Sequence, residues 1–381
     1  MLNIPETRLT EEEIRRYARH LITPEVGLAG QLKLKQAKVL CVGTGGLGSP
    51  ISIYLTAAGV GKLGLVDSDV VEVSNLQRQV LHGTADVGRS KLDSARDTLV
   101  DINPHVELEL FEARLSRANA LDILRGFDVV VDGTDNLPSR YLLSDACVVL
   151  GKPLVHASVF RFQGQLTVID AKQGPCYRCV FPEPPPPEMV QRIAVGGILG
   201  VQPGIIGCLQ ALEVIKLITG QGRPLIGRLL LFDGMDSQFR EVPVRKDPAC
   251  PACGEHCTIT EELIDYDEFC GIVKQPSPVD PKIGVPELKR RHAQAPPLVL
   301  LDVREAEEFA AGHIPGARSI PLGDLLAHVH EFAWGDDIVV YSGDERRSLA
   351  VAEKLKGFNF RRTRVLGGGY NAWLTQAEKA A

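Results

Sequence analysis

The sequence has little excess charge of either sign and no segment typical of export. Among its 381 residues, 42 are Lys or Arg and 48 are Asp or Glu, so the net charge is −6. This balance argues against a general nucleic-acid coat and against a basic membrane-surface protein. Residues 1–21 are polar and charged and contain no apolar stretch of the secretory type. We therefore expect neither a nucleic-acid partner nor a membrane partner.

Charged side chains are missing from two long stretches, residues 40–61 and 193–212. Each stretch is interrupted by clustered glycines and a proline and contains polar residues. These interruptions predict buried elements of a soluble protein instead of membrane-spanning helices. Apolar residues make up 44% of the chain and charged residues 24%, which is typical of a globular protein of two or three domains.

The chain has nine cysteines, an odd number, and no export signal. This combination favours a reducing compartment, so we expect a cytoplasmic protein. Four cysteines form two C-x-x-C pairs, Cys176 with Cys179 and Cys250 with Cys253, while Cys257 lies outside this spacing. Four thiolates suit tetrahedral Zn²⁺ with no open position, which predicts a structural site that joins two distant segments. Four unrelated buried thiols are the alternative interpretation.

From residue 37 onward, apolar runs alternate with helical patterns. The predicted strands are residues 38–42, 62–66, 128–131, 153–159 and 165–169. Ser49 and Pro50 predict a helix N-cap and a first helical position, and that helix should stop at Gly59. The alternation predicts an α/β fold with a doubly wound, Rossmann-like sheet.

The same pattern predicts two domains. The first spans residues 1–270, a proline-containing linker spans 271–285, and a smaller α/β domain spans 286–381. Near the N-terminus, Thr10 and the glutamate three residues later fit a capping box, so a helix should continue to Leu21. Its arginines, from the pattern alone, lie on a solvated face.

A nucleotide site is predicted at residues 43–48, which match G-x-G-x-x-G between a strand and a helix. Asp67 lies 19 residues after Gly48, at the end of the next strand, where an acid binds a ribose hydroxyl. A nicotinamide oxidoreductase is the usual interpretation of this fingerprint. Arg78 and Lys91 instead favour a triphosphate, although a surface pair of cations remains the alternative. Asp135, at a strand end, is placed to hold Mg²⁺.

Six segments carry a joint set of motifs: residues 16–19, 43–50, 66–69, 74–79, 133–136 and 174–179. Together they resemble the MoeB/ThiF family of ubiquitin-like-protein activating enzymes. The resemblance covers residues 9–253. A second set of motifs follows at residues 301–304, 307–309, 312–317 and 366–369, together with Trp373. These motifs resemble rhodanese, and the arrangement of the two parts resembles the MoeZ type of the family.

The resemblance implies ATP-dependent adenylation of the C-terminal glycine of a MoaD-, ThiS- or CysO-like sulfur carrier ending in Gly-Gly. It further implies a homodimer, a separate sulfur donor and a role in molybdopterin or other thio-metabolite biosynthesis. The residues that it places at ATP are Gly46, Asp67, Ser74, Asn75, Leu76, Gln77, Arg78, Lys91, Asp135 and Asn136. Arg19 would reach the phosphates of the neighbouring subunit.

Catalysis would then depend on positioning and on charge neutralisation by Arg19, Arg78, Lys91 and Mg²⁺ held by Asp135. The terminal carboxylate of a carrier is already ionised near neutral pH, so no general base is required. His82 and His156 are therefore interpreted as structural, in preference to catalytic bases.

Two positions depart from the family pattern, and both concern sulfur. Ile193 stands where relatives often carry a cysteine, and Ser342 stands where active rhodaneses have their cysteine. A hydroxyl cannot form a persulfide. Asp344 and Glu345 should also repel anionic sulfur there, partly offset by the two arginines that follow them. We expect a degenerate rhodanese-like domain with doubtful sulfurtransferase activity; a shifted sulfur site at Cys270 is the alternative.

Overall fold

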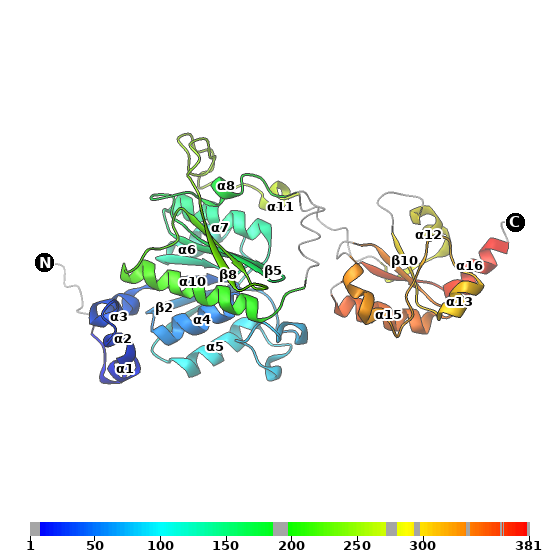
Figure 1. The fold of residues 1–381 in the computed structure, drawn as a ribbon, viewed down its shortest axis with the longest axis horizontal. Helices are drawn as coiled ribbons and strands as arrows, with labels where there is room; N and C mark the ends of the chain where they lie inside the picture. The colour runs from blue at the N-terminus through cyan, green and yellow to red at the C-terminus, as the bar shows by residue number, and fades with distance from the viewer. Residues whose placement is uncertain are drawn as a thin grey trace. The chain divides into compact units, whose positions relative to one another are not determined.

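The computed structural model describes residues 8–185, 197–271, 280–292, 298–332, 336–358, 360 and 362–378 (Figure 1). Ile193 and most of the predicted linker lie outside the described residues. The chain divides into two compact units, and the break between them falls after residue 272. Each unit is built around its own sheet.

The first unit contains an eight-stranded sheet with the strand order β3-β2-β1-β4-β5-β6-β7-β8. Its strands are β1 (Lys38–Val42), β2 (Lys62–Asp67), β3 (Glu107–Glu112), β4 (Val129–Asp132), β5 (Leu154–Phe160), β6 (Gln163–Ile169), β7 (Arg228–Asp233) and β8 (Gln238–Pro243). Pairing is parallel from β3 to β5 and antiparallel from β5 to β8. This confirms the predicted α/β sheet. The carboxyl ends of β1, β2 and β4 therefore meet at one edge.

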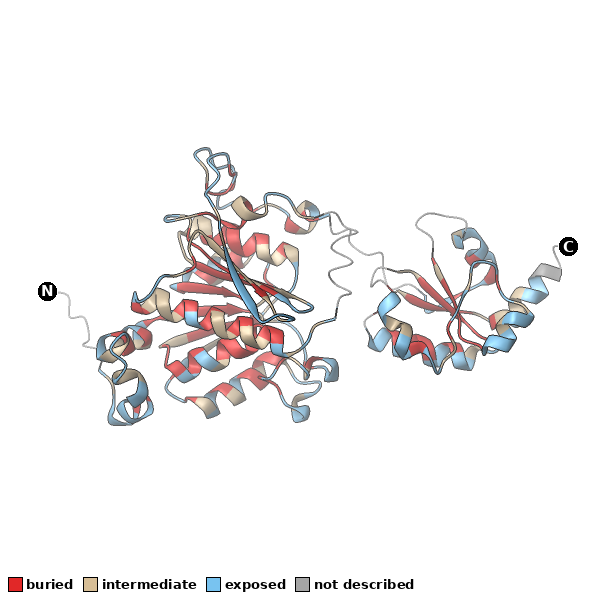
Figure 2. Ribbon diagram, viewed as in Figure 1, coloured by how far each residue is buried: buried red, intermediate tan, exposed pale blue. Residues whose placement is uncertain are grey.

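Helices cover both faces of this sheet (Figure 1). The helical elements are α1 (Glu11–Arg16), α2 (Ala18–Leu21), α3 (Gly27–Gln36), α4 (Gly48–Ala58), η1 (Val73–Asn75), η2 (Thr84–Asp86), α5 (Lys91–Ile102), α6 (Ala120–Arg125), α7 (Leu137–Leu150), α8 (Tyr177–Val180), α10 (Val201–Thr219) and α11 (Tyr266–Phe269). Alternate residues of β1 point to opposite faces: Val39 packs with α3, α4, α5 and α10, whereas Leu40 packs with α6 and α7. Figure 2 shows the buried residues concentrated along the sheet.

Among the described helices, only α10 is long and apolar enough to cross a membrane by length and composition. It packs against α4, β5 and β6. Its polar residues Gln202, Gln210 and Glu213 are buried. Gln210 donates hydrogen bonds to the backbone oxygens of Asp132 and Val155, at 2.8 and 3.2 Å. These contacts make α10 a core helix of the first unit, as the interrupted apolar stretch predicted.

Two helix boundaries differ from those expected. The Thr10 capping box is present, but the helix stops at Arg16 and restarts at Ala18. Tyr17, at the break, is buried and its hydroxyl accepts a hydrogen bond from the Asn103 side chain at 2.8 Å. The second prediction, that Ser49 caps α4, was wrong. This helix already begins at Gly48, because its first turn continues directly from the glycine segment.

The second unit is a five-stranded parallel sheet with the order β11-β10-β12-β13-β9. Its elements are β9 (Lys282–Ile283), α12 (Val285–His292), β10 (Val299–Asp302), α13 (Ala306–Ala311), β11 (Arg318–Ser319), α14 (Leu325–His328), η3 (Val329–Glu331), β12 (Ile338–Tyr341), α15 (Glu345–Gly357), β13 (Thr363–Leu366) and α16 (Gly369–Glu378). α12 and α16 pack on one face, and α14 and α15 on the other. β9 lies within the range predicted as linker and pairs with β13.

Candidate nucleotide site and cysteine cluster

The predicted glycine segment forms a tight turn where the ends of β1 and β4 touch. Gly43 has a φ of +94°, and a Cβ there would lie 2.8 Å from the Gly133 carbonyl oxygen. A Cβ on Gly48 would lie 1.9 Å from the Gly43 carbonyl oxygen. A side chain at either position would overlap backbone. The two loops can therefore approach closely only because these residues are glycines.

Asp67 lies at the end of β2 and holds this turn. Its Oδ2 accepts hydrogen bonds from the Thr44 backbone nitrogen and hydroxyl, both at 2.8 Å. Its Oδ1 accepts from the Asp69 nitrogen at 3.0 Å. The carboxylate is half-buried. Asp67 thus shapes the turn as well as standing where the nucleotide fingerprint places a ribose-binding acid.

The polar segment after β2 folds into η1 and a following loop. Asn75 is buried, and its Oδ1 accepts a hydrogen bond from the Glu72 nitrogen at 3.2 Å. Arg78 is half-buried and donates to the Ser74 carbonyl oxygen at 3.0 Å. Ser74 is exposed. The backbone of this segment is thus organised, while Arg78 keeps further donors for a ligand.

The next two residues of the segment, Leu76 and Gln77, are half-buried and exposed respectively. The Gln77 carbonyl oxygen would lie 1.9 Å from a Cβ on Gly200, just before α10. At the turn, Pro203 would lie 3.3 Å from a Cβ on Gly46. The start of α10 therefore closes one side of the glycine turn.

Lys91 supplies a buried cation beside the turn. It is the first residue of α5, and only 6% of its side chain is exposed. Its ammonium lies 2.9 Å from Asp69 Oδ2, and the Asp69 side chain is 67% exposed. A bound phosphate can share this ammonium with Asp69, because Lys carries three donors.

Asp135 and Asn136 follow β4 and are both exposed. The Asn136 Oδ1 accepts a hydrogen bond from the Ser139 nitrogen at 3.0 Å and caps α7. Within the described part of the chain, no hydrogen bond or ion pair occupies the Asp135 carboxylate. A free carboxylate at this edge is the ligand type that Mg²⁺ prefers.

Both histidines considered as bases are buried structural residues. His82 contacts the Ser94 hydroxyl at 2.9 Å and the Thr44 carbonyl oxygen at 3.2 Å. Burial lowers the pKa of His82. His156 lies 2.7 Å from Asp132, a buried acid that the sequence interpretation overlooked. Its signal was present: Asp132 ends an apolar strand directly before the Gly133 loop.

Arg19 does not lie near the glycine turn of its own chain. Its neighbour Tyr17 packs on Gly59, at the C-terminal end of α4, and bonds to Asn103 after α5. The glycine turn and Lys91 lie at the opposite ends of these two helices. Since α4 has 11 residues, about 16 Å separates its ends. Arg19 is exposed.

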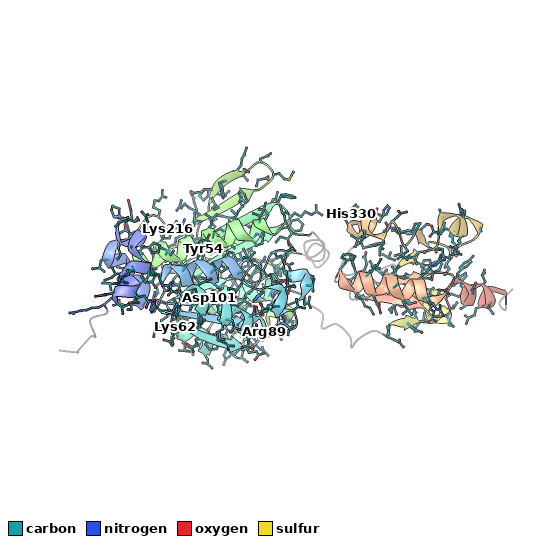
Figure 3. The ribbon with its side chains drawn as sticks, turned by 90° about the horizontal axis from the view of Figure 1, so that it is seen from below. Tyr54, Lys62, Arg89, Asp101, Lys216 and His330 are labelled. Carbon is teal, nitrogen blue, oxygen red and sulfur yellow. The ribbon has the colours of Figure 1, made fainter. Side chains whose placement is uncertain are left out.

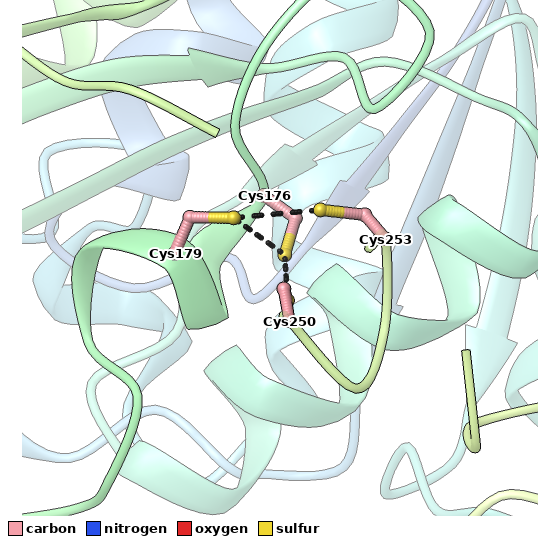
Figure 4. A group of neighbouring side chains, drawn as sticks. All are labelled: Cys176, Cys179, Cys250 and Cys253. Atoms are coloured by element: carbon pink, nitrogen blue, oxygen red, sulfur yellow. Dashed lines mark hydrogen bonds between the residues drawn. The ribbon is translucent and has the colours of Figure 1, made fainter. Parts of the chain in front are cut away.

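The two predicted C-x-x-C pairs do come together (Figure 4). All four sulfur atoms lie within 4.8 Å of one another. Sulfur–sulfur distances are 3.9 Å for Cys176–Cys179, 3.5 Å for Cys176–Cys250 and 3.4 Å for Cys179–Cys253. Tetrahedral Zn²⁺ with bonds of ~2.3 Å places sulfurs about 3.8 Å apart, so the cluster fits this metal.

The other two discussed cysteines are separate from this cluster. Cys257 is exposed and contacts the Gly254 carbonyl oxygen at 3.1 Å. Cys270 is buried in the core of the first unit, among Tyr141 and Tyr177. Burial raises its pKa to about 11. A buried, protonated thiol in this core does not support the alternative sulfur site at Cys270.

Ser342 follows β12 in the second unit and is fully buried. Its hydroxyl contacts the Ser348 hydroxyl at 2.7 Å and also the Asp344 carbonyl oxygen. Asp344 caps α15 by accepting from the Arg346 nitrogen at 3.0 Å. The hydroxyl is thus fully bonded inside the loop.

The Glu345 charge, which we expected to repel anionic sulfur, is paired with Lys282 in the structure. The Glu345 carboxylate contacts the Lys282 ammonium and the Gly368 nitrogen, each at 2.7 Å. The hydrogen bond from Lys282 lowers its pKa. β9 carries Lys282 beside the loop, a neighbour that the predicted boundary had assigned to the linker.

Comparison by sequence identifies relatives of both units. The ThiF family matches residues 17–252, and the rhodanese-like domain matches residues 285–376. The chain is 45% identical to "Adenylyltransferase and sulfurtransferase MOCS3" of Drosophila yakuba, over 98% of this chain and 85% of that protein. It is 44% identical to "Probable adenylyltransferase/sulfurtransferase MoeZ" of Mycobacterium tuberculosis, over 98% and 96%. These names give no support to the doubt about sulfurtransferase activity.

Solved structures confirm the fold of the first unit. Escherichia coli MccB crystallised with ATP superimposes with a TM-score of 0.57 and 23% identity, covering 66% of this chain and 75% of that one. PaaA gives a TM-score of 0.53 and 24% identity, covering 63% and 76%. At these identities the likeness concerns the fold alone.

The close contact at the glycine turn can be tested with two matched substitutions. Gly48→Ala should destabilise the protein by about 3 kcal/mol, because the added methyl overlaps the Gly43 carbonyl. Gly204→Ala in α10 should raise stability by about 0.5–1 kcal/mol, since its Cβ meets no atom within 4 Å and Ala favours helices. Denaturant unfolding of both variants measures the difference. Equal free energies of unfolding for the two variants would contradict the close contact between Gly48 and the Gly43 carbonyl.

Proposed function

Because the chain belongs to the ThiF family, we propose that its first unit uses ATP to adenylate the C-terminal glycine of a ubiquitin-like sulfur-carrier protein. The observation that carries this proposal is the set of charged groups on the segments that follow the strand ends: the free carboxylate of Asp135 and the cations Arg78 and Lys91. The full-length relatives are named adenylyltransferases, which supports this enzyme class over a nicotinamide oxidoreductase.

In the proposed reaction, an oxygen of the carrier's terminal carboxylate bonds to the α-phosphorus of ATP, and pyrophosphate leaves with the electron pair of the broken bond. Both reactants are anions, so the barrier is largely electrostatic. Arg78 and Lys91 neutralise phosphate charge and orient the chain of phosphates. Asp135 would hold Mg²⁺, which supplies further neutralisation when bound. No proton has to be removed from the carboxylate.

Asp135→Ala should remove Mg²⁺-dependent ATP–pyrophosphate exchange in the presence of a carrier ending in Gly-Gly. The exchange rate should fall at least about 100-fold, the usual cost of losing an electrostatic group in the active site. Asp101→Ala, an exposed acid on α5, is the matched control and should retain full exchange. Undiminished exchange in the Asp135 variant would refute the assignment.

A homodimer follows from the same proposal. Arg19 lies about one length of α4 away from the glycine turn of its own chain. If Arg19 contacts ATP, it must therefore do so in the nucleotide site of a partner subunit. α4 and α10 lie side by side, and they expose Tyr54 and Leu212 at 55% and 49%. Figure 3 labels Tyr54 on this layer. We propose that a second copy covers these apolar side chains and brings its Arg19 to the turn.

Mixed dimers test the role of Arg19 directly. Arg19→Ala and Arg78→Ala subunits should each be inactive alone in the exchange assay. Mixing them should restore partial exchange, because one site of a mixed dimer then contains both arginines. Failure to restore activity, with subunit exchange verified by a tag, would argue that Arg19 acts in its own chain or not at all.

The four-cysteine cluster is proposed to hold one structural Zn²⁺ per chain, in a cytoplasmic protein whose thiols stay reduced. Elemental analysis of purified protein should find one zinc per chain. Cys176→Ser should lose the metal, whereas Cys208→Ser, outside the cluster on α10, should keep it. A metal-free protein that is folded and active would disprove the site.

For the second unit we propose that this chain does not itself carry persulfide at position 342, and that a separate donor supplies sulfur. The relatives' names include sulfurtransferase, so this proposal depends on Ser342 alone. A serine hydroxyl stays neutral near pH 7 and forms no persulfide. The bonds of Ser342 within its loop support a structural role.

Thiosulfate:cyanide sulfurtransferase activity should accordingly be negligible, well below ~1 s⁻¹. Ser342→Cys should restore little activity unless the loop with Asp344 is also rebuilt. Turnover by the unmodified protein at an enzymatic rate would overturn the proposal, and Cys270→Ser would then identify whether Cys270 is responsible.

A further inference from the structure

A buried acid, Asp132, binds the loop that carries Asp135. Asp132 ends β4 and is 0% exposed. Its Oδ1 accepts hydrogen bonds from the Thr134 nitrogen at 2.9 Å and from the Thr134 hydroxyl at 2.6 Å. Asp135 is the next residue. The backbone direction at Asp135 therefore depends on two hydrogen bonds to a single carboxylate oxygen.

The other oxygen of Asp132 is bound by His156, which lies on the neighbouring strand β5. The His156 Nδ1 is 2.7 Å from Asp132 Oδ2, and the histidine is 2% exposed. Burial lowers the pKa of His156 and outweighs the opposite influence of Asp132. Burial alone would raise the pKa of Asp132, but the hydrogen bond from His156 holds it below its ordinary value. A neutral imidazole thus donates Nδ1–H to an ionised carboxylate.

Two other elements contact this pair, and the charge of a residue on a third acts on it. From α10, Gln210 donates to the Asp132 carbonyl oxygen at 2.8 Å. From α8, Tyr177 meets the His156 ring edge-on, with ring centroids 4.8 Å apart. From α7, the charge of Arg140 lowers the pKa values of both Asp132 and His156. A buried ionised carboxylate is costly unless its partners are fixed, and here Thr134 and His156 bind the two carboxylate oxygens of Asp132.

We propose that Asp132 and His156 are positioning residues, which hold the Thr134–Asp135 loop so that the Asp135 carboxylate is presented to Mg²⁺ and the nucleotide. This inference rests on the proposed function. Neither residue touches substrate in it; each acts through Thr134. His156 also connects the loop to α8, because its ring packs against Tyr177, the first residue of that helix. The N-cap of α8 is Cys176.

Calorimetric titration with ATP, with MgCl₂ or with EDTA, tests the proposal. Thr134→Val removes one hydrogen bond to the carboxylate and should weaken ATP binding about tenfold in Mg²⁺, as expected for a bond to a charged group. Binding in EDTA should be unchanged, because Arg78 and Lys91 are untouched. Thr134→Ser retains the hydroxyl and should bind within about twofold of the unmodified protein.

Histidine variants add a geometric test. An asparagine amide nitrogen occupies the place of Nδ1, so His156→Asn should retain Mg²⁺-dependent ATP affinity. A glutamine amide nitrogen reaches the place of the other ring nitrogen, Nε2, so the His156→Gln variant should lose the Mg²⁺-dependent ATP affinity. In free protein, the Thr134 amide should exchange hydrogen faster in the Gln variant than in the Asn variant. In an Asp135→Asn background, neither substitution should reduce affinity further.

The outcomes separate this proposal from the proposed function. Equal losses of affinity in Mg²⁺ and in EDTA would show a general structural role and overturn it. So would further losses in the Asp135→Asn background, or an unmodified protein whose ATP affinity does not depend on Mg²⁺. An unmodified protein that shows the predicted Mg²⁺ dependence and variant pattern but catalyses no exchange would support the positioning role and refute adenylation.

Discussion

The close contact between the backbones of Gly43, Gly48 and Gly133 is the constraint on which the first unit depends. It joins the turn after β1 to the loop after β4 with no room for a side chain. Because β2 and β4 each pair in parallel with β1, the polar residues at the carboxyl ends of the three strands lie close together. Asp67 braces the turn and Asp135 stands free beside it. The electrostatic character of the site follows from this convergence of backbones.

The sequence predicted the structure correctly where a local pattern of residue types determines the local structure or the bound group. The five strands predicted between residues 38 and 169, the glycine turn and the two cysteine pairs lie where their patterns predicted, whereas β3, β7 and β8 were not predicted. It failed where a tertiary partner decided the outcome. The break at Tyr17 depends on Asn103, far along the chain, and the pairing of Glu345 depends on Lys282. No local pattern around Tyr17 or Glu345 contains those partners.

Asp132 illustrates a different limit. Its position at a strand end was visible, but its importance comes from burial between β4 and β5 and from His156, which the chain reaches 24 residues later. Conversely, the departure at Ser342 could be recognised from the sequence, because a serine has no thiol whatever its environment in the fold. The two units therefore differ: the first contains the charged groups that its proposed chemistry needs, whereas the second has the bonded hydroxyl of Ser342 where the rhodanese pattern has a cysteine.

The most direct test of adenylation is which bond of ATP breaks. The chain should be incubated with Mg²⁺, a carrier ending in Gly-Gly and ATP labelled with ³²P at the γ-phosphate, and the labelled product separated by chromatography. Attack at the α-phosphorus predicts labelled pyrophosphate and a carrier whose mass, by mass spectrometry, has increased by one AMP group. Labelled orthophosphate with ADP, and a carrier without AMP, would contradict the account.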